Sequence, residues 1–340
     1  MARTRRSTEP LAATPRRVVV TGGAGLVGRA IVRVLRERGD TVVALVRDPG
    51  RAPFLAELGA DLVASDLATV ENIAEQLHGA DAVIHAAGSY RVGITKAERG
   101  AMWDANVGTT TRMLDAAERA GTPRFVDVST VNVFGNTHGR VVDETYRRDL
   151  AEGFLSWYDE TKYGAHEVAE QRIAAGAPVV IVLPSQVYGP GDRSAVGEQI
   201  RLAHDGRLRY RALDGFGIGF VHADDLAAGI VAALDRGEVG RSYILSGPRT
   251  TLDEVLGAAA RLGGHRLPRL RLPDTIVRVL APVGGLIGQP NLGELVDASV
   301  GVTYLGSSAR AEQELGFTAR DVETGLRDVY GETAAPAAAG

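Results

Sequence analysis

The chain has 340 residues, of which 45% are apolar, so it is long and apolar enough to bury a substantial core. Its formal net charge of -4 provides no basic field for a phosphate backbone, and we therefore expect no nucleic-acid partner. The absence of cysteine excludes disulfides and thiolate metal sites, and the histidines show no metal-binding spacing, so we predict no metal site.

No apolar stretch is long enough for a signal peptide or a membrane span, so we expect no membrane association and a cytoplasmic location. Residues 1–15, which are rich in Arg, Ser, Thr and Pro, and residues 333–340 are predicted to be disordered tails.

From Arg17 onward, short β-branched runs alternate with longer amphipathic segments. This alternation is typical of a parallel sheet covered by helices on both faces, so the predicted fold class is α/β, a doubly wound Rossmann sheet. In chain order the predicted elements are strand RVVVT, a helix over 26–38, strand TVVALV, a helix near Leu55, strands DLVAS and DAVIHAA, a helix through Met113, strand RFVDVS, a helix over about 158–175 and strand PVVIVLPS.

After Pro190 the alternation gives way to shorter segments rich in Gly, Arg and Leu. We therefore predict a dinucleotide-binding domain over residues 16–190. A smaller C-terminal lobe over 191–332 is predicted to bind the substrate, with some of its segments returning to the main sheet.

The segment TGGAGLVG directly follows the first predicted strand and opens the first helix. Gly22, Gly25 and Gly28 permit a tight turn and close packing of helix on strand, while Leu26 and Val27 begin the helix. The backbone amides and the positive end of the helix dipole would then face a pyrophosphate. This context predicts dinucleotide binding.

An acidic residue at the end of the second strand would ordinarily bind the adenosine ribose. Here that position is Val46, followed by Arg47, whose guanidinium suits a 2′-phosphate. We therefore favour NADP(H) as the cofactor, and NAD(H) stays open because Asp48 would serve if the strand ended later. Asp66 and Leu67, after the third strand, are predicted to flank the adenine.

Tyr158 and Lys162 form a Tyr-x-x-x-Lys pair, which a helix places on one face, one turn apart. The chain has only two lysines, Lys96 and Lys162, and chance puts a lysine at this spacing in roughly one such chain in twenty. A phenol is too weak an acid to act as a base at neutral pH, and a nearby ammonium favours the phenolate. We predict that Tyr158 exchanges a proton with the substrate and that Lys162 lowers its pKa and binds the nicotinamide ribose.

A third hydroxyl is expected to bind the same substrate oxygen, and VSTVNVFG follows the fifth strand at the cofactor face. Ser129 and Thr130 are both candidates. A Ser or Thr at a strand end commonly only closes a turn, so position alone does not decide.

Taken together, TGGAGLVG, HAAG, NVGT, VSTVNVFG, the Tyr158 and Lys162 pair and PSQVYGPGD resemble the extended short-chain dehydrogenase/reductase family. The resemblance runs from about Arg17 to beyond FVHADDL. It implies that Thr130 is the catalytic hydroxyl with Ser129 just before it. It further implies that Ala86, Ala87 and Gly88 pass beside the cofactor diphosphate and ribose, and that the segment with Pro184, Ser185 and Val187 lies beside the nicotinamide. His85 and Asn106 would be structural.

Two positions narrow the choice among the reactions of this family. The dehydratases of this family resemble one another in an Asp-Glu pair after the catalytic Thr, whereas this chain has Val131 and Asn132, which transfer no proton. Our order is an NADP(H)-dependent ketone or aldehyde reductase first, a sugar-nucleotide epimerase with retained NAD(P) second, and a non-catalytic cofactor-binding protein third.

The substrate is expected to be a small molecule whose identity depends on loops after Pro190. Trp157, Tyr188, Phe216 and Phe220 are candidates for its pocket, with core packing as the alternative. Both a monomer and a homodimer stay open. Five arginines would bind a nucleotide diphosphate in an epimerase: Arg193, Arg201, Arg207, Arg209 and Arg211.

Overall fold

The structure is a computed structural model that describes residues 15–213, 216–280 and 292–331. The segments 1–14 and 333–340, which the sequence predicts to be tails, lie outside the described residues.

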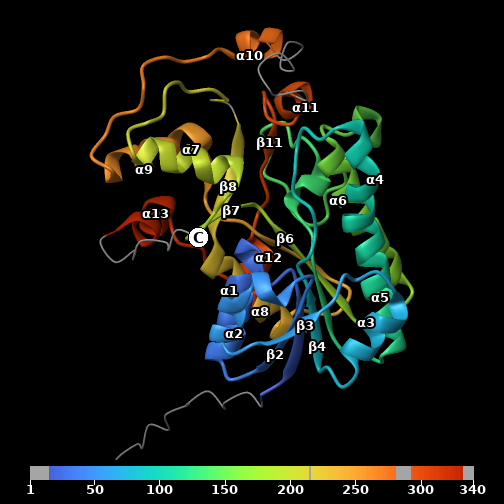
Figure 1. Cartoon of the computed structure of the whole chain (residues 1–340). Coiled ribbons are helices and arrows are strands. Elements are labelled where there is room, and N and C mark those ends of the chain that lie inside the picture. The colour runs from blue at the N-terminus through green and yellow to red at the C-terminus, as the bar shows by residue number, and fades with distance from the viewer. Residues whose placement is uncertain (1–14, 214–215, 281–291, 332–340) are drawn as a thin grey trace, which may run out of the picture.

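A seven-stranded sheet forms the centre of the molecule (Figure 1). Its strand order is β3-β2-β1-β4-β5-β6-β9, and every neighbouring pair is parallel. The predicted Rossmann-type α/β fold is confirmed, and each predicted strand is present. The strands are β1 Arg17–Thr21, β2 Thr41–Val46, β3 Asp61–Ala64, β4 Ala82–His85, β5 Phe125–Val128, β6 Val179–Pro184 and β9 Ser242–Leu245.

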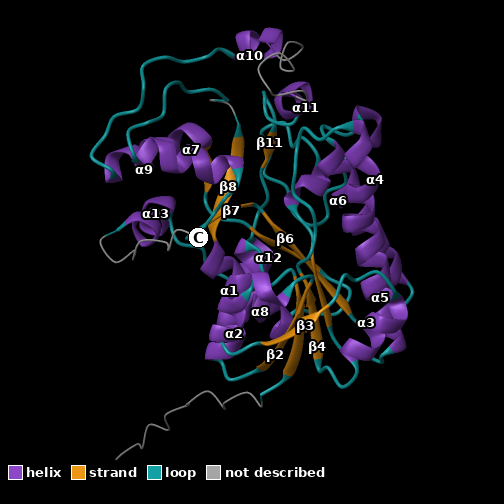
Figure 2. Ribbon diagram, in the orientation of Figure 1, coloured by secondary structure: helices purple, strands orange, loops and turns teal. Residues whose placement is uncertain are grey.

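Helices cover both faces of this sheet (Figure 2). Alternate residues of β1 divide between two cores, with Val19 packing in the same core as Met113 and Val18 in the same core as Ile31. One face is covered by α1 Leu26–Glu37, α2 Pro53–Glu57, α8 Ala223–Arg236 and α12 Ala309–Leu315; the other face is covered by α3 Val70–Leu77, α5 Thr109–Arg119 and α6 Trp157–Ala174.

The sequence does not predict α3. This helix buries only Ile73 and Leu77, and a single pair four residues apart gives no periodic signal. Before α5, the helix α4 Arg99–Trp103 continues through the π-helical turn η3 Asp104–Gly108.

A second, four-stranded sheet lies beyond the carboxyl ends of the main strands (Figure 1). It begins with β7 Gln186–Tyr188, which follows β6 almost directly. Its other strands are β8 Gly217–His222, β10 Arg249–Thr251 and β11 Thr303–Tyr304; the remaining helices of this region are α7 Ala195–His204, α9 Leu252–Leu262, α10 Asp274–Leu280, α11 Leu292–Asp297 and α13 Val322–Tyr330. The predicted division at residue 190 stays a prediction.

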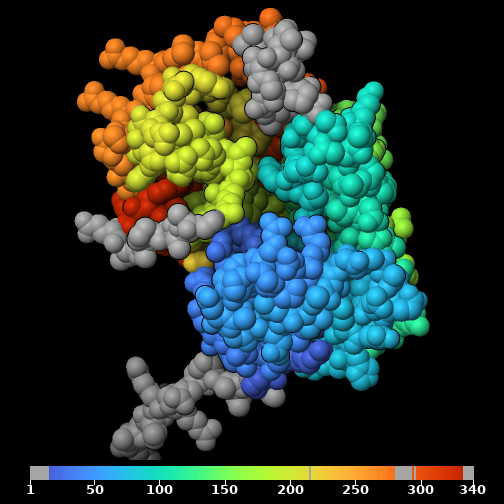
Figure 3. All heavy atoms as spheres, viewed as in Figure 1, coloured from blue at the N-terminus to red at the C-terminus, as the bar shows by residue number. Residues whose placement is uncertain are grey.

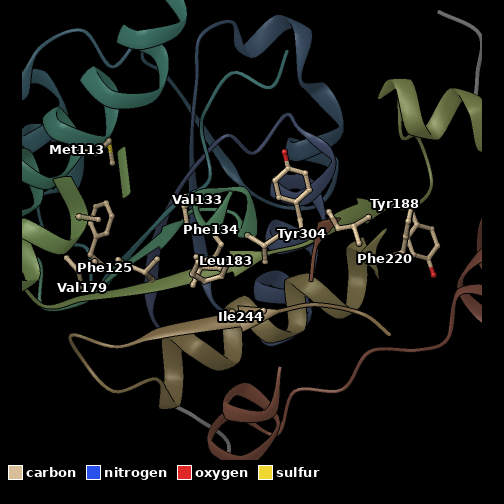
Figure 4. Packing of buried hydrophobic residues seen from close by; sticks show 14 of the residues in the cluster. Met113, Phe125, Val133, Phe134, Val179, Leu183, Tyr188, Phe220, Ile244 and Tyr304 are labelled. Carbon is tan, nitrogen blue, oxygen red and sulfur yellow. The ribbon is translucent and has the colours of Figure 1, made fainter. Parts of the chain in front are cut away.

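The two sheets share one apolar core. Tyr188, Phe220, Ile244 and Tyr304 belong to one cluster of buried side chains (Figure 4). Tyr188 and Phe220 are 2% and 0% exposed, so these two aromatic residues contribute to packing rather than to a pocket wall.

Candidate active site

The candidate site lies at the carboxyl ends of the main strands. The strand order reverses between β1 and β4, because the chain continues to β2 on one side and from β4 to β5 on the other. Such a switch leaves a crevice between the loops that follow the two strands. Figure 3 shows a hollow where blue atoms of the N-terminal part, teal atoms near residue 100 and yellow atoms near residue 210 meet.

The loop after β1 turns tightly into α1. Gly22 has a φ of +73°, which favours glycine, and its carbonyl accepts a hydrogen bond from the Gly25 amide at 3.0 Å. A Cβ on Gly28 would lie 2.0 Å from the Gly22 oxygen, so this packing requires glycine. A Cβ on Gly25 would approach no atom closer than 3.4 Å. Gly25 is exposed, so it offers bare backbone to a ligand.

The N-terminus of α1 is suited to an anion. Gly25 caps the helix without a side-chain hydrogen bond, and the first turn has no acidic residue. The amides of Leu26 and Val27 belong to the first turn, where no preceding helical carbonyl can accept from them. Together with the helix dipole, these amides fit the diphosphate of a dinucleotide.

The loop after β4 packs against the loop after β1. The Ala86 amide donates to the Thr21 carbonyl at 3.3 Å, and the Ala87 amide donates to Thr21 Oγ1 at 3.2 Å. A Cβ on Gly22 would lie 2.5 Å from the Ala86 oxygen. The two predicted cofactor-binding loops are therefore in contact. Thr21 Oγ1 is also 2.7 Å from His85 Nδ1, and burial lowers the pKa of His85 to about 3, so this histidine is neutral.

Asn106 joins the loop after β4 to α6. Its Oδ1 accepts from the Ser89 amide at 2.7 Å, and its Nδ2 donates to Thr161 Oγ1 at 2.9 Å. A Cβ on the exposed Gly88 would lie 3.1 Å from Asn106 Oδ1. Asn106 therefore holds the loop beside the helix that carries Tyr158.

A hollow of about 280 Å³ lies at the carboxyl ends of β2 and β3. β2 ends at Val46, which is buried, and the exposed Arg47 lines the hollow together with Asp66. No hydrogen bond or ion pair engages the Arg47 side chain among the described residues. Asp48 Oδ1 instead accepts from the Gly50 amide at 3.0 Å and caps the turn η1 Pro49–Arg51.

Leu67 departs from the predicted arrangement in one respect. It has a φ of +56°, and its side chain is 8% exposed within the apolar core. Its carbonyl accepts from Arg112 Nε at 2.7 Å. Any contact of Leu67 with an adenine is therefore limited to its backbone and the edge of its side chain.

Tyr158 lies in the first turn of α6, which is capped by Ser156 Oγ. Its ring is 8% exposed and packs edge-on against Tyr90, with ring centroids 4.8 Å apart. Ile94 and Met102 complete an apolar cluster around it. Burial raises the pKa of Tyr158, and the neighbouring Tyr90 raises it further, while hydrogen bonding to Thr130 opposes the rise.

The expectation that Lys162 lowers the pKa of Tyr158 is wrong for this structure. Lys162 Nζ donates to the Val128 carbonyl at 3.1 Å, and its charge interacts with Asp127. The ammonium is therefore engaged by β5, and desolvation of the phenol dominates. Tyr158 is protonated at neutral pH.

The two candidate hydroxyls have different surroundings. Thr130 Oγ1 donates to Asn132 Oδ1 at 2.9 Å, and the interaction of Thr130 with the phenol opposes the rise in the pKa of Tyr158. Ser129 Oγ is 3.1 Å from His166 Nδ1, on the side of α6 one turn beyond Lys162. The geometry brings Thr130, rather than Ser129, beside the phenol.

The segment after β6 enters the second sheet. Pro184 is buried at the end of β6, and Val187 pairs with Val221 of β8. The Ser185 amide donates to the Leu245 carbonyl at 3.3 Å, while its buried Oγ has no hydrogen-bond partner among the described residues. An unpartnered buried hydroxyl at a cofactor crevice fits a polar ligand group.

Sequence reasoning missed Glu294 of α11. Its carboxylate accepts hydrogen bonds from the Trp157 amide at the start of α6 and from the Gly93 amide at 2.9 Å. The C-terminal region thus contacts both α6 and the loop that carries Tyr90. No sequence motif marks this residue, because the contact spans more than 130 positions.

Within the described ranges, no cluster of three or more His, Asp or Glu side chains is arranged to hold a metal ion. In the same ranges, no helix combines the length and apolarity needed to cross a bilayer.

Comparison with known proteins gives consistent results. Residues 18–246 match the NAD dependent epimerase/dehydratase family. The chain is 32% identical to a Synechocystis sp. protein named "Putative dihydroflavonol 4-reductase", over 91% of this chain and 92% of that protein. It is 28% identical to the 2-alkyl-3-oxoalkanoate reductase of Stenotrophomonas maltophilia, over 94% of this chain and all of that protein. Its fold is similar to that of MoeE5 in complex with UDP-glucose and NAD, with a TM-score of 0.72, 26% identity and coverage of 92% and 97% of the two chains.

Proposed function

Because this chain belongs to the NAD-dependent epimerase/dehydratase family, we propose that it is an oxidoreductase that reduces a ketone or aldehyde with NADPH. The relatives that are similar over nearly the whole chain include reductases of carbonyl compounds by name. A cytoplasmic location remains part of this proposal, from the sequence alone, and both a monomer and a homodimer stay open.

The observation that carries the proposal is the buried, protonated phenol of Tyr158 beside Thr130. Carbonyl reduction adds a hydride to carbon and a proton to oxygen, so it needs an acid at the oxygen. The buried phenol is protonated at neutral pH, and an alkoxide that develops on the substrate is basic enough to take this proton.

Each residue then has a separate task. When bound, the reduced nicotinamide supplies the hydride that forms the new bond to the carbonyl carbon. Tyr158 transfers its phenolic proton to the carbonyl oxygen, and Thr130 turns its hydroxyl from Asn132 to donate to the same oxygen. Lys162 lies one helical turn from Tyr158, where its ammonium would bind the hydroxyls of the nicotinamide ribose.

The preference for NADPH is supported by Arg47. Its exposed guanidinium has no protein partner among the described residues and lines the hollow beside β2. Asp48, the carboxylate that would favour NADH, accepts a hydrogen bond from the Gly50 amide. A guanidinium suits a 2′-phosphate, and a buried Val46 offers nothing to a ribose hydroxyl.

A sugar-nucleotide epimerase is the second candidate, since the similar MoeE5 structure holds UDP-glucose and NAD. Arg207 and Arg209 line a hollow of about 430 Å³ together with Tyr210. Two other arginines that would serve this function are neutralised: Arg201 pairs with Glu198, and Arg211 pairs with Asp253. An epimerase would need these arginines free to bind a diphosphate, so their pairing with carboxylates favours the reductase.

The third candidate is a non-catalytic cofactor-binding protein. Such a protein would have no use for Tyr158, Thr130 and Lys162 in one group.

The test is NADPH oxidation with a panel of ketones and aldehydes by the parent and by Tyr158→Phe. Removal of the phenolic hydroxyl in Tyr158→Phe should lower turnover by about 10²- to 10⁴-fold and leave cofactor affinity unchanged. Tyr163→Phe, one turn further along α6, is the matched control and should keep full turnover. Conversion of a UDP-sugar without net NADPH consumption would instead establish the epimerase, and inactivity in both assays would favour the binding protein.

A further inference from the structure

Between β5 and α6 lies a polar group that the proposed chemistry does not use. Asp127 is in the middle of β5, and its side chain is 3% exposed. Among the described residues it forms no hydrogen bond through its carboxylate. Burying a carboxylate in a strand-helix interface is unfavourable unless a nearby charge compensates it.

Lys162 supplies such a charge: burial raises the pKa of Asp127, and the ammonium of Lys162 opposes this rise. Lys162 Nζ bonds the carbonyl of Val128, the residue after Asp127, so the ammonium is fixed against the same strand. On β4, burial lowers the pKa of His85, and the positive charge of Lys162 lowers it further, so His85 is neutral. Of the acidic side chains that the structure describes, Asp127 is the one that acts on this lysine.

A second polar group of α6 lies next to this pocket. His166 follows Lys162 by one turn of α6, is 7% exposed and acts on Asp127 electrostatically. Its Nδ1 is 3.1 Å from Ser129 Oγ, and its Nε2 is 3.4 Å from a carboxylate oxygen of Glu170, which is 35% exposed. His166 is thereby held beside Asp127 by partners on either side.

We propose that Asp127 is a positioning residue of the active site, whose buried carboxylate is the counter-charge that keeps Lys162 protonated and held against β5. This role of Asp127 rests on the proposed function in one respect, namely that Lys162 takes part in cofactor binding. Burial alone lowers the pKa of Lys162, and the carboxylate opposes this. Without Asp127, the lysine would lose its proton at lower pH, and its hold on the nicotinamide ribose would weaken with it.

The two lysines of the chain make a direct test practical. Protein labelled with ¹³C at lysine Cε gives two signals in an NMR titration, and Lys96→Arg assigns them. Lys96 is exposed and serves as the internal reference. In Asp127→Asn, which keeps the side-chain shape, the acid dissociation constant of Lys162 should rise by at least about tenfold while that of Lys96 stays constant. NADPH affinity, measured by fluorescence, should weaken at alkaline pH earlier than in the parent.

Ser129→Ala is the matched control, since it breaks the contact with His166 on the same strand without changing the charge. It should leave the Lys162 titration close to that of the parent. Asp127→Thr, which is neutral and suits a strand, provides a second variant if the amide disturbs folding. An unchanged Lys162 titration in folded Asp127 variants would mean that the carboxyl group is protonated and would overturn the proposal. A shifted titration in a protein that reduces no carbonyl would leave this inference standing and remove the reductase.

Discussion

Arg148 and Asp159 form an ion pair in which Nη1 and Oδ1 are 3.2 Å apart and the two side chains are only 4% and 1% exposed. Asp159 follows Tyr158 directly, and its Oδ2 also accepts from the Leu155 amide at 3.1 Å. Arg148 additionally donates to the Gly153 carbonyl at 2.7 Å. The pair therefore fixes the loop before α6 to the turn that carries the phenol.

Replacing one partner should be strongly destabilising, because it leaves the other charge buried and uncompensated. We expect Arg148→Met to lower the free energy of unfolding by about 3 to 5 kcal/mol, measured by urea denaturation. The double variant Arg148→Met/Asp159→Leu removes both charges and should recover most of the loss. A double variant as unstable as the single one would show that the arginine acts through packing on Phe154 and Tyr163 instead.

The loss of stability in Arg148→Met should also depend on pH. Burial raises the pKa of Asp159 and Arg148 opposes the rise, so in Arg148→Met the folded-state pKa lies further above the unfolded value. The folded state then binds more protons in that window, and stability falls as pH rises through it. We expect the variant to be closer to the parent at mildly acidic pH than at neutral pH.

The hydroxyl of Thr130 should matter for the rate and not for stability. Thr130→Val keeps the shape and removes the donor, so turnover should fall about 10²-fold or more, as for loss of an oxyanion donor. Thr130→Ser should retain much of the activity. Steady-state kinetics on both variants and on Ser129→Ala decide the assignment, since a more damaging Ser129→Ala would identify Ser129 as the catalytic hydroxyl.

Substitution of Gly25 should weaken cofactor binding without destabilising the fold. A Cβ here meets no atom within 3.4 Å, so the unfolding free energy of Gly25→Ala should stay within about 0.5 kcal/mol of the parent. The added methyl group occupies the space in which a diphosphate would approach the backbone, and NADPH affinity should fall about tenfold or more. Isothermal calorimetry measures this. Gly28→Ala is the contrasting variant, because a Cβ 2.0 Å from the Gly22 oxygen should disturb the fold itself.

Arg47 should set the cofactor preference. A charge-assisted hydrogen bond to a 2′-phosphate contributes about 1.5 to 3 kcal/mol, so Arg47→Ala should weaken NADPH binding roughly tenfold to a hundredfold and leave NADH nearly unchanged. The preference should shrink as salt is raised, since the guanidinium is exposed. Equal affinities of the parent for the two cofactors would remove this support and favour the epimerase.

The sequence was sufficient for the sheet and for the placement of Thr130, Tyr158 and Lys162 near one another, because each follows from a local pattern at a strand end or on one helix face. The sequence did not reveal which groups act on the pKa of Tyr158 or which group binds the Lys162 ammonium. The pKa of Tyr158 depends on Tyr90 and on burial, and the partner of Lys162 is a carbonyl on β5, so neither can be inferred from spacing along α6. Glu294 and Arg148 were missed for the same reason, since their contacts form only when distant segments pack.

The position of β9 has a consequence for how this protein is made. β6 is complete at Pro184, but the strand that pairs with its free edge begins only at Ser242, after the whole of β7, α7, β8 and α8. A nascent chain therefore leaves the ribosome with an apolar strand whose backbone donors and acceptors await a partner still to be translated. An open edge of this kind invites pairing with another chain, so we expect synthesis to depend on chaperones at this stage. For the same reason, we expect a fragment that ends at residue 190 to aggregate more readily than the whole chain.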